Sequence, residues 1–154
     1  MMIEEVKKVG LISMNILFFL TPKSEVAYIN DTFTLRETIE KMEYHRYTAI
    51  PMINKAGEYI GTITEGDLLW SIKNKYSLNL YEAENVKITD IPRRMDNEPV
   101  NVNCNIEDLI MTSMRQNFVP VIDDDDIFIG IIKRKDIIEY CFNKLKKQNK
   151  GEGQ

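Results

Sequence analysis

An internal repeat constrains this chain more than any other feature of its sequence. The stretch IGTITEGD at 60–67 returns as IGIIKRKD at 129–136. Three pairs of landmarks share one offset of 69 positions (120 − 51, 130 − 61 and 136 − 67), namely Pro51 and Pro120, Gly61 and Gly130, and Asp67 and Asp136. Because each half of a 154-residue chain is too small to bury much surface alone, the repeat predicts two half-modules that share a core.

Both copies contain the same predicted order of elements, β-α-β-β-α. In the first copy we expect strands over 24–29, 48–53 and 58–63 and helices over 34–45 and 66–76. In the second we expect strands over 98–102, 118–122 and 127–132 and helices over 105–117 and 134–147. Thr34 and Glu37 have capping-box spacing, which supports a helix start there. The fold class is therefore predicted to be α+β.

The repeat also divides the chain into segments. We expect an N-terminal helical leader at 1–20, repeat one at 21–75, a polar connector at 76–95, repeat two at 96–148 and a disordered tail at 149–154. The apolar run at 9–20 superficially resembles a signal peptide. Acidic residues precede it, polar residues interrupt it, and it is too short to cross a bilayer, so we expect a packed helix and no membrane association.

Charge and composition exclude several classes of site. A net charge of −4 gives no general reason to expect nucleic-acid binding. One histidine, His45, excludes a histidine-rich metal site, and we expect no metal. The spacing of Cys104 and Cys141 favours free thiols in a reducing compartment, which predicts a cytoplasmic protein. The acidic run at 123–126 lacks calcium-loop spacing and is expected to be a hairpin turn.

The repeated stretch at 64–67 and 133–136 has two interpretations. Thr64 and Asp67 match a capping box, which is a purely structural device. The same helix start offers free backbone N–H groups to a phosphate, and its carboxylate can accept the hydroxyls of a ribose. In the second copy Lys133 replaces the threonine while Asp136 remains, so capping alone does not explain the pattern. An aspartate near the positive end of a helix dipole remains a structural reason for Asp136.

The two copies differ in charge. TEGD carries −2, whereas KRKD carries +2, so only the second loop is suited to phosphate. A solvated helix start is the structural alternative for the basic run. No nucleophile motif or phosphate-cradling glycine loop accompanies either copy, so we expect no enzyme and no cofactor.

The segments YTAIPMINKAGEYIGTITEGDLL and NFVPVIDDDDIFIGIIKRKDII resemble the two halves of a CBS-domain pair, or Bateman module. The resemblance covers about 21–145 and implies tandem repeats packed about a pseudo-twofold axis. The chain is most similar to small stand-alone bacterial CBS proteins that bind cyclic di-AMP or other adenine nucleotides. The resemblance implies a non-catalytic sensor of cyclic di-AMP, AMP or ATP that regulates a partner protein.

The resemblance also implies two ligand clefts, each joining the pre-proline segment of one repeat to the helix start of the other. The first is expected to use Ala27, Ile29, Tyr47, Thr48, Ala49, Pro51, Lys133, Arg134, Lys135 and Asp136. The second is expected to use Val100, Val102, Asn117, Phe118, Val119, Pro120, Thr64, Glu65 and Asp67. The first is the better nucleotide site, because Tyr47 can stack on a purine while Arg134 and Lys135 hold phosphate.

Two further expectations concern assembly. CBS pairs commonly dimerise through their helices, and the apolar residues of DLLWSI and DIIEYCF predict a homodimer. The alternative function is a ligand-independent module for protein interaction or dimerisation, in which the basic loop and the apolar helix faces contact a partner directly.

Overall fold

The structure is a computed structural model that describes residues 4, 14–94 and 96–152. Most of the predicted helical leader lies outside these residues. Its end forms a 3-10 helix, η1 (Ile16–Phe19), followed by β1 (Leu20–Pro22) and a second 3-10 helix, η2 (Lys23–Glu25). Ile16 and Phe19 are buried, so this part of the leader is packed, as predicted.

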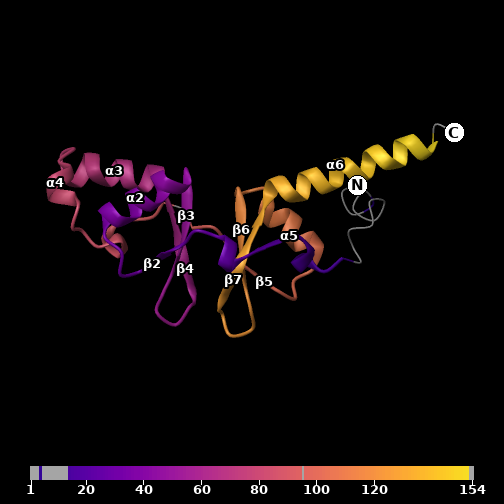
Figure 1. The fold of residues 1–154 in the computed structure, drawn as a ribbon, viewed down its shortest axis with the longest axis horizontal. Coiled ribbons are helices and arrows are strands. Elements are labelled where there is room, and N and C mark those ends of the chain that lie inside the picture. Colours follow the sequence, from indigo (N-terminus) through magenta and orange to yellow (C-terminus); the bar gives the residue numbers. More distant parts are fainter. Residues whose placement is uncertain (1–3, 5–13, 95, 153–154) are drawn as a thin grey trace.

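The predicted β-α-β-β-α order is confirmed in both repeats (Figure 1). The first repeat comprises β2 (Ile29–Asn30), α2 (Leu35–His45), β3 (Ala49–Ile53), β4 (Tyr59–Thr64) and α3 (Glu65–Lys75). The second comprises β5 (Val100–Asn101), α5 (Ile106–Ser113), β6 (Phe118–Ile122), β7 (Phe128–Lys133) and α6 (Arg134–Glu152). Thr34 and Glu37 form the capping box predicted at the start of α2.

The two repeats have the same strand register. Met52 pairs with Gly61 in the β3–β4 hairpin, and Val121 pairs with Gly130 in the β6–β7 hairpin. Each hairpin also has one irregularity, immediately after Met52 in the first repeat and after Val121 in the second. The acidic run at 123–126 joins β6 to β7 as the predicted turn.

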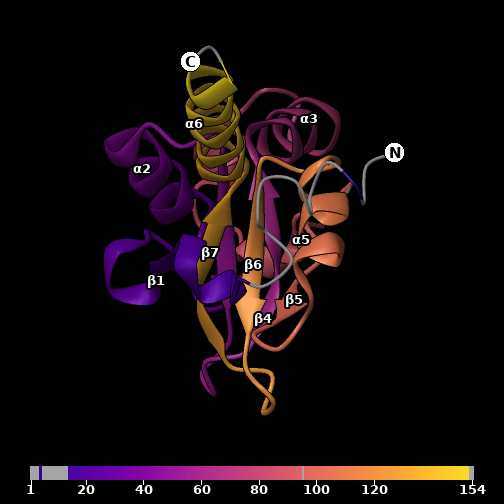
Figure 2. The same ribbon diagram turned by 90° about the vertical axis from the view of Figure 1, so that its right-hand side faces the viewer.

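Each repeat is closed at one edge by the segment that precedes the other repeat. β1 pairs antiparallel with β7, so that Thr21 lies opposite Ile131 (Figure 2). A Cβ atom on Gly130 would lie 2.2 Å from the carbonyl oxygen of Thr21, so only glycine permits this approach. In the first repeat Asp96 Oδ1, just after the connector, accepts the backbone N–H of Thr62 at 3.1 Å, and Arg93 in the connector donates to the Ile60 carbonyl of β4 at 3.3 Å.

Three apolar clusters form the core. One belongs to the first repeat and one to the second, and the latter includes Ile16 and Phe19 from the N-terminal segment. The third is shared between the repeats and contains Val26, Ile53, Phe118, Phe128 and Ile131. Because both repeats contribute to it, the predicted shared core is present.

Several predicted element bounds are wrong. The strands expected over 24–29 and 98–102 shrink to two residues each, because only Ile29–Asn30 and Val100–Asn101 pair with a neighbouring strand. The helix expected over 105–117 ends at Ser113. The tail expected to be disordered from residue 149 is helical to Glu152, because lysine-rich sequence has good helix propensity and favours a helix C-terminus.

The connector is more structured than its polar composition predicts. It contains α4 (Leu80–Ala83), where the Asn79 side chain caps the helix start, and a 3-10 helix, η3 (Ile88–Asp90). Ala83, Ile88 and Ile91 are buried in the core of the first repeat. The connector is therefore part of that repeat's packing.

Candidate functional site

The start of α3 forms a closed hydrogen-bond network. The Thr64 hydroxyl accepts the N–H of Asp67 at 3.1 Å, and Asp67 Oδ2 accepts the N–H of Thr64 at 3.0 Å. Asp67 Oδ1 accepts the N–H of Arg94, in the connector, at 3.1 Å. The Asp67 residue is only 3% exposed. Both carboxylate oxygens thus have internal partners, which supports the structural interpretation of this copy.

The start of α6 is open by comparison. Lys133 and Lys135 are exposed and Asp136 is half-buried. Among the described residues, no hydrogen bond or ion pair uses the Asp136 carboxylate. The Arg134 N–H donates to the Asn117 carbonyl at 3.0 Å, and its guanidinium hydrogen-bonds to the Asn117 side chain. Within the described part of the chain, the basic loop has no carboxylate partner. Its charge is therefore available to an anion.

Within each repeat, the segment before the hairpin proline contacts the start of that repeat's own second helix. Ala49 is opposite Thr64 in the β3–β4 pairing, and the Glu65 N–H donates to the Thr48 carbonyl at 3.0 Å. In the second repeat Phe118 is opposite Lys133. These contacts exist because each hairpin brings its own two strand ends together. The clefts predicted from sequence join each pre-proline segment to the helix start of the other repeat, and they stay a prediction.

Each repeat has a pocket beside the start of its second helix. One, of about 420 Å³, has Arg46 and Tyr47 beside the acidic residues Glu43 and Glu65. Arg46 ends α2 in the left-handed conformation, with φ of 57°, which turns the chain toward β3. The other, of about 660 Å³, is lined by Asn117, Arg134, Lys135, Ile138, Glu139 and Phe142. Only the second combines several cations with an exposed aromatic ring.

Burial divides the predicted site residues into two groups. The buried members are Ala27, Ile29, Pro51, Asp67, Val100, Phe118, Val119 and Pro120. Partly or fully exposed members are Tyr47, Thr48, Ala49, Thr64, Glu65, Val102, Asn117, Lys133, Arg134, Lys135 and Asp136. Only the second group presents side-chain surface to a ligand, whereas the first forms the frame beneath it.

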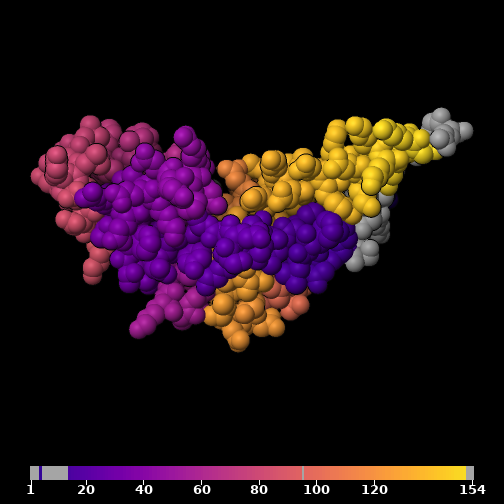
Figure 3. All heavy atoms as spheres, viewed as in Figure 1, coloured from indigo at the N-terminus to yellow at the C-terminus, as the bar shows by residue number. Residues whose placement is uncertain are grey.

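The exposed groups of the two repeats lie near the boundary between them. Ala49 packs against the shared cluster that contains Phe118 and Ile131. Figure 1 shows α3 and α6 starting at the same central end of the sheets and running away from each other. In Figure 3 a notch separates the magenta first repeat from the orange and yellow second repeat at this position.

The sequence interpretation missed the role of the connector at the first helix start. Arg93 donates to Asp96 at 2.7 Å and to the Ile60 carbonyl at 3.3 Å, next to the network of Asp67. A signal was present, because Pro22 and Pro92 are 70 positions apart (92 − 22), close to the repeat offset. The connector thus corresponds to the segment around β1.

Comparison with known proteins agrees with this architecture. A family model for the CBS domain matches residues 19–74 and 88–143. The chain belongs to the CBS-domain family. Its fold, two CBS repeats forming a Bateman module, matches the prediction from sequence.

Solved CBS proteins have the same fold. CbpB in complex with c-di-AMP has a TM-score of 0.80, 24% identity, and coverage of 96% of this chain and 98% of that chain. CbpB of Listeria monocytogenes in complex with c-di-AMP has a TM-score of 0.77 and 18% identity, covering 86% and 98%. CBSX2 in complex with AMP has a TM-score of 0.68 and 19% identity, covering 85% and 98%.

One curated relative also matches, an uncharacterized protein of Methanocaldococcus jannaschii. It is 21% identical over an alignment of 140 residues that covers 82% of this chain. The chain spans about half the length of that relative, 49%. No helix among residues 14–94 and 96–152 is long and apolar enough to span a membrane.

Proposed function

We propose that this CBS pair is a non-catalytic regulatory protein that binds an adenine nucleotide, with cyclic di-AMP as the first candidate and AMP and ATP as the others. The contrast between the two helix starts carries the proposal. Asp67 is buried and engaged by backbone N–H groups, whereas Asp136 has no such partner and stands in a loop with three cations. The AMP and c-di-AMP complexes of other CBS proteins support the choice of ligand.

Each group in the open site has a chemical role in this proposal. Arg134 and Lys135 hold phosphate, since a guanidinium and an ammonium form strong charge-assisted hydrogen bonds with it. Asp136 accepts the sugar hydroxyls. Tyr47 and Thr48, near the repeat boundary, supply an aromatic face and backbone groups to the base.

The signal in this proposal is a change in the arrangement of the two repeats. A ligand that touches both repeats stabilises one arrangement only if its affinity differs between arrangements. The resulting surface is offered to a target protein. The free thiols of Cys104 and Cys141, whose pKa values are raised by burial, fit a reducing compartment, and we place the protein in the cytoplasm.

The experiment is a thermal-shift and calorimetry panel of adenine and guanine nucleotides. A ligand at about 100 times its dissociation constant adds about 2.7 kcal/mol of stability, which raises the melting temperature of a chain this size by about 5–10 °C. Arg134→Glu is expected to abolish the shift. The matched control is Lys146→Glu, which makes the same charge change at an exposed position further along α6.

Two results would contradict the proposal. One is a panel in which none of cyclic di-AMP, AMP and ATP raises the melting temperature. The other is an equal loss of binding in Arg134→Glu and Lys146→Glu, which would indicate nonspecific charge attraction.

A second proposal concerns assembly. Leu69 on α3 is 53% exposed, and Ile138 and Phe142 on α6 are 60% and 62% exposed. Ile138 and Phe142 are four positions apart on one helix face, so they form a continuous apolar ridge. We propose that these faces form a homodimer interface. The alternative function, a dimerisation module that needs no ligand, would use the same interface.

A further inference from the structure

A third pocket, of about 350 Å³, lies away from the proposed nucleotide site. It is lined by η2, the end of β2 and the turn between β3 and β4. β3 begins at Ala49, beside the start of α3, and ends at Ile53, which lines this pocket. The two places are thus separated by the length of the strand, about 13 Å.

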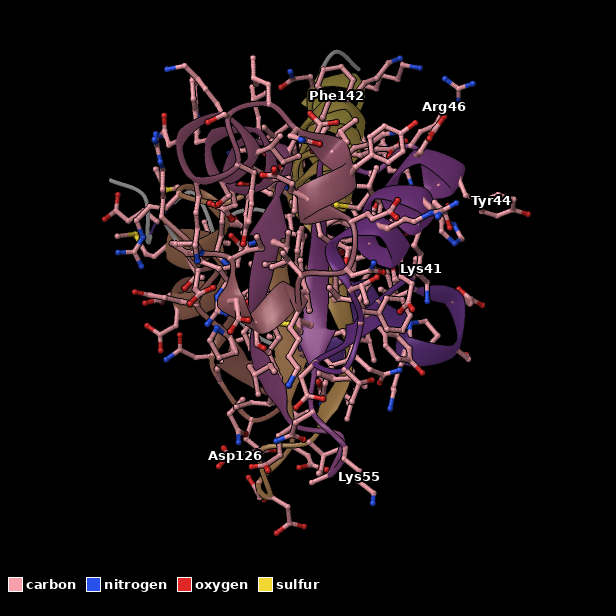
Figure 4. The ribbon with its side chains drawn as sticks, turned by 90° about the vertical axis from the view of Figure 1, so that its left-hand side faces the viewer. Lys41, Tyr44, Arg46, Lys55, Asp126 and Phe142 are labelled. Atoms are coloured by element: carbon pink, nitrogen blue, oxygen red, sulfur yellow. The ribbon has the colours of Figure 1, made fainter. Side chains whose placement is uncertain are left out.

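Two lysines, Lys23 and Lys55, line this pocket, and a third, Lys41, lies beside the Tyr28 ring, which also lines it. Lys23 Nζ lies 5.2 Å from the centroid of the Tyr28 ring, and Lys41 Nζ lies 5.4 Å from the same centroid. Lys55 lines the pocket from the hairpin turn. Figure 4 shows Lys41 on the α2 side, between Arg46 above and Lys55 below. Positive charge therefore gathers around one aromatic ring.

These lysines have no ion-pair partner among the described residues. None of the salt bridges formed by the described residues includes Lys23, Lys41 or Lys55, and Asp31 is the one carboxylate among the residues that line the pocket. Lys23 and Lys41 are also only partly exposed, which is unusual for lysine. Their mutual repulsion is offset in part by the ring, and would be offset further by a bound anion.

The pocket also offers neutral donors. Among the hydrogen bonds of the described residues, none uses the Tyr28 hydroxyl, the Asn30 amide or the Thr32 hydroxyl. Because both ammonium groups lie within 5.4 Å of one centroid, they are at most about 11 Å apart. A ligand with two linked phosphates offers each lysine a charge partner, and these neutral donors can complete its hydrogen bonding.

We propose that this pocket binds a small anion carrying two linked phosphate groups, at a site separate from the nucleotide site. The proposal does not depend on nucleotide binding, because it uses different residues at the other end of β3. The protein would then respond to a second anionic ligand besides the nucleotide.

The test is a titration of the full chain with inorganic pyrophosphate, followed by two-dimensional amide NMR at constant ionic strength set with sodium chloride. We expect saturable shifts of the Tyr28, Asn30 and Thr32 peaks. The double substitution Lys23→Gln with Lys41→Gln is expected to weaken binding about tenfold or more, because it removes two charge-assisted contacts. Arg134→Glu is expected to leave these shifts unchanged.

Lys144→Gln is the matched control, because Lys144 Nζ also lies over a tyrosine ring, 5.5 Å from the centroid of Tyr140. It is expected to bind pyrophosphate at Tyr28 as the unaltered chain does. Three outcomes would overturn the proposal: peaks moving only at 133–136, equal shifts with sodium chloride alone, or equal weakening in Lys144→Gln.

Discussion

The Asp67 carboxylate accepts the backbone N–H of Arg94 at 3.1 Å, across 27 positions of sequence. The same carboxylate closes the capping box with Thr64. One buried side chain therefore fixes both the start of α3 and the path of the connector. Asp136, its counterpart in the repeat, has no corresponding hydrogen bond among the described residues.

Asp67→Ala is therefore expected to destabilise the fold by about 2–4 kcal/mol, since it removes a helix cap and leaves buried N–H groups unpaired. Asp136→Ala, the matched change, is expected to cost less than about 0.5 kcal/mol while weakening nucleotide binding. Urea unfolding measures the free energy of unfolding of both variants. Trp70, the one tryptophan, lies 5.4 Å from the Arg94 guanidinium and reports the connector by fluorescence. Equal stability losses in the two variants would contradict the assignment of separate roles.

Gly130→Ala is expected to separate β1 from β7, because the added Cβ atom would meet the Thr21 carbonyl oxygen at 2.2 Å. We expect a loss of about 2 kcal/mol or more in chemical unfolding, as for other strained backbone contacts. Gly66→Ala is the control. Its Cβ atom would meet nothing closer than 3.7 Å, and alanine favours a helix, so its stability should be unchanged or higher by up to about 1 kcal/mol. A Gly130 variant as stable as the Gly66 variant would disprove the edge role of β1.

Tyr59 links the repeats through its hydroxyl, which lies 2.6 Å from Thr62 Oγ1 and donates to the Asn97 carbonyl at 2.9 Å. Burial raises the pKa of Tyr59 well above its ordinary value of 10.0. The folded state therefore retains this proton when the unfolded state has lost it. Its stabilising contribution is complete below pH 10 and is lost as pH rises through the folded pKa.

In Tyr59→Phe this pH-dependent contribution disappears. We expect the free energy of unfolding of the unaltered chain to fall more steeply above pH 10 than that of the variant, measured by urea titration at several pH values. Tyr81→Phe is the control, because Tyr81 is 87% exposed. Identical slopes for all three chains would count against a buried, neutral Tyr59.

Phe142→Asp is expected to convert the proposed dimer to a monomer, because it puts a charge into the apolar ridge of α6. Light scattering over a range of protein concentrations measures the molar mass and so distinguishes the dimer from the monomer. Glu139→Asp, a conservative change on the same helix, should leave the dimer intact. A monomeric unaltered chain at high concentration would contradict the dimer proposal.

The fold could be predicted well from the sequence because both copies of the repeat contain the same pattern of landmark residues. The landmarks at Pro51, Gly61 and their counterparts define the hairpins, and turn residues fix the register. Short parallel strands such as Val100–Asn101 were overestimated, because strand composition extends beyond the residues that have a pairing partner. The buried connector was missed because Ala83, Ile88 and Ile91 are too widely spaced to form a periodic pattern.

The candidate site was predicted in part. The reversal of charge between the two loops could be predicted from the sequence. In the structure the positive charge of residues 133–135 is not neutralised, because no carboxylate of the described residues forms a salt bridge with them. The pairing of segments across the two repeats stays a prediction. The role of Asp67 as an anchor was missed, because it depends on Arg94, which is distant in sequence. A contact between a side chain and a backbone group far away in the sequence leaves no pattern in the local sequence.

The exchange of edge segments between the repeats bears on the origin of the duplicated gene. The strand that closes the second repeat comes from before the first, and the residues that close the first come from before the second. An ancestral protein with one copy could close its edge in the same way, by donating its leading segment to another molecule and receiving one in return. Duplication and fusion would then have made a reciprocal pair of chains into one.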